Sequence, residues 1–224
     1  MEATEVTVRD VTNVGADTIA ITLATPETFD ADPGEFVLVR AAIGGSDGAG
    51  DTSDTSDGGE EIARHYTLSS PTVEDTFEIT VGIDPDGDLT PWLAALESGD
   101  VLTIEGPFGN VTYEGDGDVV VLAGGPGVGP AVGIGERARE AGHDASIVYL
   151  DESPAHEARL SALADGGASV SITGDESSFS SAVSSVASAG QVYVFGFESF
   201  CELSLEALEA AGVDPDDALV ESFG

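Results

Sequence analysis

Lysine is absent from this sequence of 224 residues, and six arginines stand against 43 aspartates and glutamates, giving a formal net charge of -37. Walker-type phosphate loops, which serve nucleotide hydrolysis, depend on a lysine, so this kind of site is disfavoured. A nucleic-acid-binding surface needs a dense basic patch, which six scattered arginines do not supply. The scarcity of positive charge therefore argues against nucleotide hydrolysis and against nucleic acid as a partner.

Metal-binding and cross-linking side chains are equally scarce. Cys201 is the only cysteine, which excludes an intrachain disulfide, a four-cysteine zinc site and a cysteine-ligated iron-sulfur cluster. The three histidines are scattered without the spacing of metal ligands, so no metal site is expected.

Long apolar runs are missing as well. No run approaches the roughly 18 residues of a transmembrane helix, and residues 1–5 lack the basic and apolar regions of a signal peptide. The expected location is the cytoplasm, with no transmembrane segment. The sequence carries no indication of the oligomeric state.

Enough apolar sequence remains for a packed core, because 41% of the residues are hydrophobic and the mean hydropathy is +0.08. The acidic residues are spread along the whole chain rather than collected in a tail. Such a surface suits molar salt, where the Debye length is about 3 Å and mutual repulsion is largely screened. We interpret the acidity as the mark of a halophilic organism.

The first half of the chain has the alternating apolar and polar pattern of half-buried strands. The predicted strands are residues 5–14, 18–25, 35–42, 63–69, 76–83 and 101–105. A short helix is predicted over 91–97, with Thr90 as its N-cap and Pro91 in its first turn. Residues 44–61 contain no large apolar side chain and predict a mobile acidic surface loop. Six short strands with one small helix indicate a closed antiparallel barrel over residues 1–114.

After residue 114 the pattern changes to unbroken apolar runs alternating with helical segments. The predicted strands are residues 119–123, 145–150, 169–173, 192–195 and 219–223. The first predicted helix ends at residue 141, and the other three span 155–163, 179–187 and 200–211. This alternation predicts an α/β domain over residues 115–224, with a five-stranded doubly wound parallel sheet.

Two segments carry the functional signal. Residues 64–70 place an arginine, a tyrosine and several hydroxyls together, which suits a phosphate and a flat ring; the alternative is a surface arginine on a strand with a core tyrosine. Residues 124–130 form a glycine-rich turn between a buried strand and a helix, which predicts a phosphate seat. The alternative for this turn is close packing of the helix on the strand.

Seven short segments carry a family resemblance. They are 33–35 (Pro-Gly-Glu), 64–67 (Arg-His-Tyr-Thr), 87–90 (Gly-Asp-Leu-Thr), 99–100 (Gly-Asp), 106–109 (Gly-Pro-Phe-Gly), 123–130 (Ala-Gly-Gly-Pro-Gly-Val-Gly-Pro) and 221–224 (Glu-Ser-Phe-Gly). In this order, over nearly the whole chain, they resemble the motifs of the ferredoxin-NADP reductase family of flavoproteins. The resemblance implies an FAD-binding barrel followed by a nicotinamide-nucleotide domain.

The resemblance also implies residue roles. Arg64 would neutralise the FAD pyrophosphate, Tyr66 would pack beside the flavin ring or ribityl chain, and Thr67 would act catalytically by hydrogen bonding near flavin N5. The rest of the FAD would be held by Val81, Gly82, Ile83, Asp88, Leu89 and Thr90. The pyrophosphate of the nicotinamide cofactor would be received by Gly124, Gly125, Gly127, Val128, Gly129 and Pro130.

The second strand of this half is followed by Asp151 and Glu152, and a carboxylate there would accept the ribose 2'-OH and repel a 2'-phosphate, which favours NADH over NADPH. The alternative is NADPH, with its 2'-phosphate approached by Arg137, Arg139 or Arg159.

Near the C-terminus the family has Cys-Gly-Pro beside the nicotinamide, whereas this chain has Phe195-Gly196-Phe197. Phe195 and Gly196 are expected to contact the cofactor, with Phe195 stacking or filling the pocket. Glu221 is expected to relay a proton or orient the nicotinamide, and Phe223 to shield the flavin.

The resemblance implies an FAD-dependent oxidoreductase that transfers electrons between NAD(P)H and a separate acceptor such as ferredoxin, a quinone, free flavin or a partner subunit. The chain ends without the cysteine-rich cluster segment of some relatives, so a separate carrier is expected. One alternative is a flavin or ferric reductase. The other, motivated by the missing Cys-Gly-Pro, is a non-catalytic flavin-binding or assembly subunit.

Overall fold

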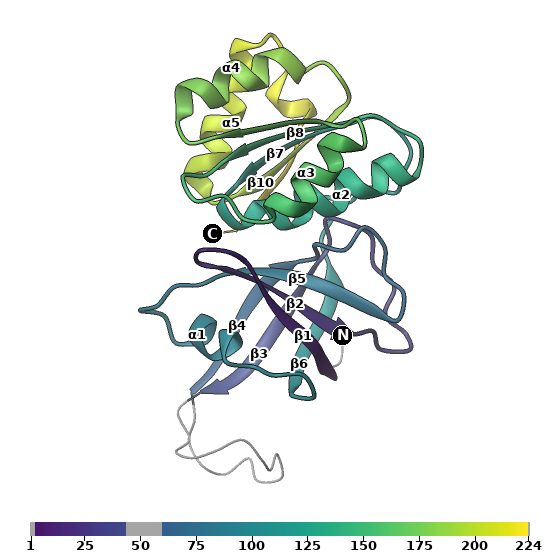
Figure 1. Ribbon diagram of the computed structural model, residues 1–224, viewed down its shortest axis with the longest axis vertical. Helices are drawn as coiled ribbons and strands as arrows, with labels where there is room; N and C mark the ends of the chain where they lie inside the picture. The colour runs from purple at the N-terminus through teal and green to yellow at the C-terminus, as the bar shows by residue number, and fades with distance from the viewer. Residues whose placement is uncertain (1–2, 44–59, 224) are drawn as a thin grey trace.

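A computed structural model describes residues 3–43 and 60–223 of the chain. The acidic loop expected over residues 44–61 lies outside this range except for its last two residues, and so does Gly224 of the last motif. Figure 1 shows an antiparallel barrel below and a parallel sheet flanked by helices above. The two kinds of sequence pattern therefore correspond to two separate sheets.

The barrel is a six-stranded antiparallel sheet in the order β4-β3-β6-β1-β2-β5. Its strands are β1 (Thr4–Gly15), β2 (Thr18–Ala24), β3 (Phe36–Ile43), β4 (Glu60–Thr67), β5 (Thr76–Gly82) and β6 (Val101–Phe108). Just beyond β4, Leu68 forms a β-bridge with Ile79 of β5, and the Ser69 N–H donates to the Glu78 carbonyl at 2.8 Å. The edges of the sheet thus meet, and the predicted barrel is confirmed.

Two local predictions in the barrel are wrong. Helix α1 spans Leu89–Ala94 with Asp88 at its N-cap position, rather than starting at Pro91 behind a Thr90 cap. The Thr90 hydroxyl instead bonds the backbone of Asp84, accepting from its N–H at 2.9 Å and donating to its carbonyl at 3.0 Å. Strand β4 begins at Glu60, so the last two residues assigned to the acidic loop belong to a strand.

The second half is a five-stranded parallel sheet in the order β11-β10-β7-β8-β9, as predicted. Its strands are β7 (Val119–Gly124), β8 (Ala145–Leu150), β9 (Ser169–Thr173), β10 (Gln191–Gly196) and β11 (Leu219–Ser222), and its helices are α2 (Val128–Glu140), α3 (Glu157–Asp165), α4 (Glu176–Val186) and α5 (Glu198–Ala210). Two short 3-10 helices, η1 (Gly125–Gly127) and η2 (Pro215–Asp217), complete it. The strand order reverses between β7 and β10, which is where ligands bind in such sheets.

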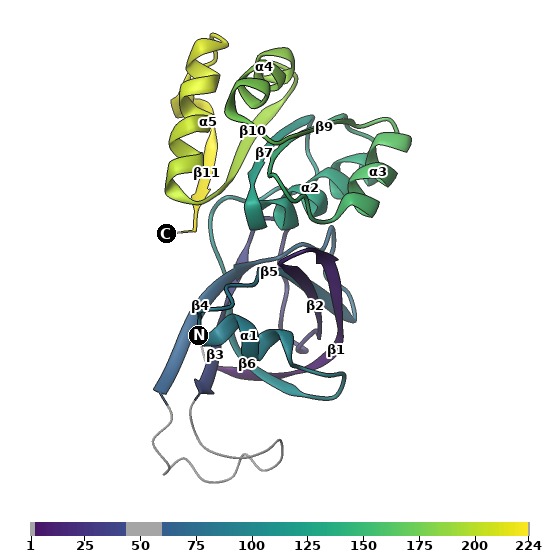
Figure 2. The same ribbon diagram turned by 60° about the vertical axis from the view of Figure 1, so that its left-hand side comes forward.

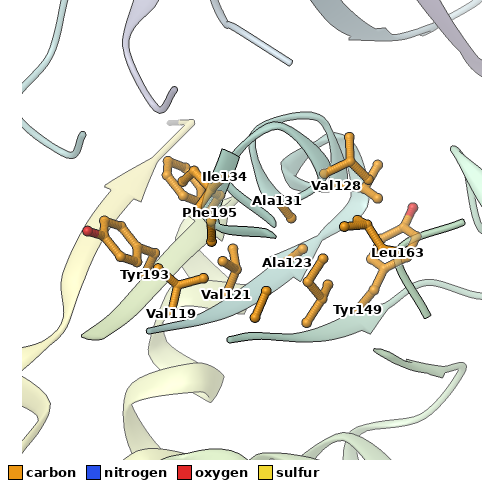
Figure 3. Close-up of a cluster of buried hydrophobic side chains, with 14 of the residues drawn as sticks. Val119, Val121, Ala123, Val128, Ala131, Ile134, Tyr149, Leu163, Tyr193 and Phe195 are labelled. Carbon is orange, nitrogen blue, oxygen red and sulfur yellow. The ribbon is translucent and has the colours of Figure 1, made fainter. Parts of the chain in front are cut away.

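Both faces of the parallel sheet are covered, which explains its unbroken apolar strands. Along β7, Val119, Val121 and Ala123 pack under α2 and α3, whereas Val120 and Leu122 pack against α4 and α5. Figure 2 shows α4 and α5 on one side of the sheet and α2 and α3 on the other. Figure 3 shows the cluster under α2.

Helix α2 packs directly on the barrel because two glycines on one of its faces permit a close approach. A Cβ atom on Gly129 would lie 2.6 Å from Cβ and Oγ1 of Thr80, and one on Gly133 would lie 3.0 Å from the carbonyl oxygens of Ser69 and Ser70. The barrel and the parallel sheet therefore meet through backbone-level contacts. Across the described ranges, no helix combines the length and apolar character needed to span a membrane.

Candidate functional site

A cleft of about 730 Å³ lies between the barrel and the carboxyl ends of the parallel strands. Its barrel wall is lined by Asp17, Thr18, Ile62, Arg64, His65, Tyr66, Thr67, Thr80, Gly82, Ile83, Asp84, Gly87, Asp88, Leu89 and Thr90. Its opposite wall is lined by Gly125, Pro126, Pro130, Asp151, Ser153, Phe197 and Phe223. Both predicted functional segments, 64–70 and 124–130, thus reach one cleft.

Strand β4 supplies a cation, a ring and a hydroxyl to this cleft. The Arg64 side chain is exposed, its Nη1 donates to the Ala63 carbonyl at 2.9 Å, and it forms no salt bridge within the described residues. Burial raises the pKa of Tyr66 to about 12, an effect that the nearby Arg64 charge reduces. Thr67 is 7% exposed. The strand therefore presents guanidinium donors beside a flat, neutral phenol ring and a sheltered hydroxyl.

The segment from β5 to α1 forms the adjoining part of the barrel wall. Gly82 and Ile83 line the cleft, as do Asp88, Leu89 and Thr90 of the predicted FAD contacts. Val81 does not line the cleft; its side chain is fully buried and it pairs with Ile19 of β2. Alternation along β5 turns Val81 into the barrel core, so only its neighbours face the ligand side.

Most glycines of the glycine-rich turn are closely packed against neighbouring atoms. A Cβ on Gly124 would strike the Phe200 ring, one on Gly127 would strike the carbonyl oxygen of Phe195, and Gly129 faces Thr80. Val128 is likewise fully buried. Close packing thus accounts for the lack of larger side chains at these glycines, and the reception of a pyrophosphate by the backbone of the turn stays a prediction.

Gly125 is different, because its φ of +54° suits glycine and a Cβ there would meet no atom within 4 Å. It lines the cleft with Pro126 and Pro130. The turn therefore offers open backbone to a ligand at one point, while the remaining glycines let it pack.

Asp151 lies in the cleft immediately after β8, where the sequence predicted a ribose-reading carboxylate. Its Oδ1 accepts from the Ser153 N–H at 2.8 Å, and its Oδ2 accepts from the Tyr149 hydroxyl at 3.0 Å. Burial raises the pKa of that tyrosine, so it remains a neutral donor. The Asp151 carboxylate is thereby held in one orientation.

The arginines considered as partners of a 2'-phosphate lie outside the cleft lining. Arg137 lies beside Gly115, Arg139 donates to Asp144 at 2.7 Å, and Arg159 donates to Glu136 and Glu78. Among the described residues, Arg64 is the one arginine that lines the cleft.

The end of β10 corrects the predicted nicotinamide contact. The Phe195 side chain is fully buried beside Ile134 in the core under α2 (Figure 3), and Gly196 is also outside the cleft lining. Phe197 lies in the cleft instead, 53% exposed, and its ring packs edge-to-face on Phe223 with centroids 6.1 Å apart. The sequence could have indicated Phe197, because this residue directly follows β10, one of the two strands between which the strand order reverses.

Glu221 also lies outside the cleft lining, on β11 in register with Phe195. Burial raises the pKa of its carboxyl group. Its neighbour Phe223 reaches the cleft because its N–H donates to the Gly196 carbonyl at 2.9 Å. Sequence reasoning also missed Asp17, Thr18 and Thr80, because strand pairing brings Thr18 beside Gly82 and Asp17 beside Ile83, and Thr80 meets the parallel-sheet half only in the folded chain.

Comparison with known proteins matches residues 5–113 to the family described as oxidoreductase FAD-binding domain. The glycine betaine monooxygenase reductase subunit of Chromohalobacter salexigens is 35% identical over 114 residues, which are 49% of this chain and 27% of that protein. A flavohemoprotein of Candida albicans is 32% identical over 96 residues, 42% of this chain and 24% of its own. The matches thus span about a quarter of the length of these relatives.

Solved structures match the entire chain. A ferredoxin NADP+ reductase from Neisseria gonorrhoeae with bound FAD and NADP has a TM-score of 0.76 at 18% identity, covering 100% of both chains. A ferredoxin reductase in carbazole 1,9a-dioxygenase has a TM-score of 0.76 at 20% identity, covering 100% of this chain and 68% of its own. At these identities the likeness shows the fold. Residues 5–113 therefore match the family described as oxidoreductase FAD-binding domain, and the whole chain has the two-sheet fold of these ferredoxin reductases.

Proposed function

We propose that this chain is an FAD-dependent oxidoreductase that takes electrons from NAD(P)H and passes them to a separate acceptor. The observation that carries the proposal is the cleft itself. The Arg64, Tyr66 and Thr67 side chains on the barrel wall face Gly125 and Asp151 on the wall of the parallel sheet. One site thus has the means to hold a flavin nucleotide and a second nucleotide side by side.

The barrel wall fits FAD. The exposed Arg64 guanidinium binds the pyrophosphate, for which its planar fork of donors is suited. Tyr66 offers a ring face to the flavin or ribityl chain, and Thr67 holds a hydrogen bond near N5. Gly82, Ile83 and residues 88–90 contact the remainder. When bound, FAD accepts two electrons from a nicotinamide and releases them singly or in a pair.

The opposite wall fits a nicotinamide nucleotide. The open backbone at Gly125, with Pro126 and Pro130 beside it, receives the pyrophosphate, and the fixed Asp151 carboxylate accepts the ribose 2'-OH. NADH is therefore the preferred donor. Phe197 takes the place that the sequence assigned to Phe195, and Glu221, outside the cleft, is not part of the proposed catalytic group.

The electron acceptor is proposed to be a separate carrier. With Cys201 as its one cysteine, this sequence has no ligand set for a cluster of its own. The reductase subunit and the ferredoxin reductase among its relatives support a protein acceptor such as a ferredoxin or an oxygenase component. We place the boundary between the barrel domain and the nucleotide-binding domain near residue 114. The acidic composition supports a location in the salt-rich cytoplasm of a halophilic organism.

Anaerobic mixing of the FAD-loaded protein with NADH tests the proposal. Loss of the visible absorbance of the oxidised flavin is the expected result, because hydride transfer from NADH reduces the flavin. Tight FAD binding without bleaching by NADH or NADPH would instead support a non-catalytic flavin-binding or assembly subunit. The absence of the family cysteine and the burial of Phe195 favour that second candidate.

A further inference from the structure

The two walls of the cleft are joined by an arginine that lies outside it. Arg159 on α3 donates from Nε and Nη2 to the two carboxylate oxygens of Glu136 on α2, at 2.8 and 2.6 Å. Its Nη1 donates to Oε1 of Glu78 on β5 at 2.8 Å, and its Nη2 also donates to the Ser69 carbonyl at 2.7 Å. One guanidinium thus connects α2 and α3 of the parallel-sheet half with β5 and the segment after β4.

The barrel side of this connection is itself tightly organised. Oε1 of Glu78, which accepts from Arg159, also accepts from the Ser69 hydroxyl at 2.7 Å, and Ser69 is fully buried. Ser69 follows Thr67, the proposed flavin contact, by two residues. A displacement of Arg159 is therefore transmitted to the wall of the cleft through a short, hydrogen-bonded path.

The geometry of the contact needs arginine. A guanidinium presents donors in a rigid planar fork and satisfies a bidentate carboxylate together with further acceptors, whereas lysine carries a point charge on a flexible stem. The side chains of Arg159, Glu78 and Glu136 are each 25% exposed, so solvent screens them only partly. The glycine face of α2 beside this network leaves the two halves little freedom to slide.

We propose that Arg159 is a positioning residue: it sets the orientation of the parallel sheet relative to the barrel, and with it the separation of the two ligands in the cleft. The kinetic part of this inference rests on the proposed function, and the structural part does not. A misplacement of about 1 Å between reacting groups can cost about 100-fold in rate. Each wall would keep its own binding contacts, because Arg159 lies outside the cleft lining.

The test uses Arg159→Gln, which removes the guanidinium that joins the halves, and Glu78→Gln, which removes the charge of its partner on the barrel side and leaves the Ser69 carbonyl in place. Arg139→Gln is the matched control, because Arg139 also donates to a carboxylate and to two carbonyls but only inside the parallel-sheet half. Residual dipolar couplings of the full, FAD-loaded chain report the orientation of the barrel against the sheet. The wild type and the control should fit one common orientation, and the two test variants a different or averaged one.

Anaerobic stopped-flow mixing with NADH supplies the second readout. In the test variants the limiting rate of flavin bleaching should fall about 10- to 100-fold, while the Kd for FAD and the half-saturating NADH concentration change less than about threefold. Arg159→Lys should recover only part of the rate.

Wild-type orientation and wild-type limiting rate in both test variants would overturn the inference, and so would an equal loss in the Arg139→Gln control. If the wild type itself is not bleached, the proposed function fails, and the dipolar couplings alone then decide whether Arg159 sets the orientation. Should Arg159→Gln fail to fold, Glu78→Gln decides the question, since it preserves the Arg159–Glu136 pair within the parallel-sheet half.

Discussion

The hydroxyl of Thr80 on β5 and Nε2 of His156 lie 2.8 Å apart, across the boundary between the barrel and the parallel-sheet half. His156 adopts a left-handed backbone conformation with φ of 54°, and its N–H donates to the Val14 carbonyl of β1 at 2.8 Å. The side chain is 3% exposed. This neutral imidazole is therefore a buried part of the contact between the two halves.

The titration of His156 predicts a pH dependence of stability. Burial, and secondly the Arg159 charge, lower the pKa of His156 from 6.5 to about 4 in the folded protein. Between these values the unfolded chain binds more protons, so the free energy of unfolding falls as the pH drops from about 6.5 to about 4, by up to about 3 kcal/mol. Below that range His156 causes no further loss. Denaturant unfolding at several pH values and constant salt measures the effect.

The control for this prediction is His156→Gln, whose amide can keep a hydrogen bond to Thr80 but does not titrate. The charged groups around the site, Arg159 with Glu78 and Glu136, are common to both proteins, as are Glu35 and Glu221, whose carboxyl pKa values burial raises. Their contributions cancel in the difference. Identical slopes of stability against pH in the two proteins would contradict the prediction.

Removal of the cleft arginine should release the flavin. An arginine-phosphate hydrogen bond contributes about 1.5 to 3 kcal/mol, so Arg64→Ala should weaken FAD binding roughly 10- to 150-fold. The ratio of flavin to protein absorbance after purification, and a titration with FAD, measure the loss. Arg9→Ala, which removes an exposed arginine of β1 outside the cleft lining, should keep its FAD. An Arg64→Ala variant that purifies with full flavin content would show that the assignment is wrong.

Neutralising the ribose carboxylate should shift the nucleotide preference. Two like charges about 4 Å apart in water repel by about 1 kcal/mol, so Asp151→Asn should lower the ratio of kcat/KM for NADH to that for NADPH by about fivefold. Glu152→Gln removes the next acid along the chain, which is exposed and outside the cleft lining, and should leave the ratio unchanged. A wild-type preference for NADPH, or an equal shift in the control, would refute the role given to Asp151.

The packing of α2 on the barrel predicts an unusual sign for a helix substitution. Alanine is normally more stable than glycine inside a helix, by roughly 1 kcal/mol. At Gly129, however, the new Cβ would lie 2.6 Å from Thr80, so Gly129→Ala should destabilise the protein by about 1 to 3 kcal/mol. Gly117→Ala, where a Cβ meets nothing within 4 Å, should be close to neutral. Urea unfolding compares the two, and a stabilised Gly129→Ala would disprove the tight contact.

Much of the fold was predictable because local patterns specify it. Alternation marked the barrel strands, and the unbroken run 119–123 marked a strand covered on both faces. The start of α1 was not predictable from cap preferences, because the Thr90 hydroxyl bonds the backbone of Asp84 six residues away rather than the helix N-terminus. A hydroxyl that could cap a helix can instead bond other backbone groups that the folded loop brings close to it.

The candidate site was predictable only in part. Arg64, Tyr66, Thr67 and Asp151 all reach the cleft, because each stands on or just after a strand whose direction the pattern sets. Phe195 and Phe197 could not be told apart in this way, since the choice depends on where β10 ends and what covers it.

By itself, the sequence determined the order and kind of the elements, the two sheet types and the segments that carry ligand-binding side chains, because periodicity and residue chemistry are properties of the chain. The tertiary structure decided which of these residues face the cleft. It assigned three glycines of the turn to packing and left Gly125 open. It also turned Arg159 and His156 toward the barrel, because Glu78, Ser69 and Thr80 lie beside them only after distant segments have packed together.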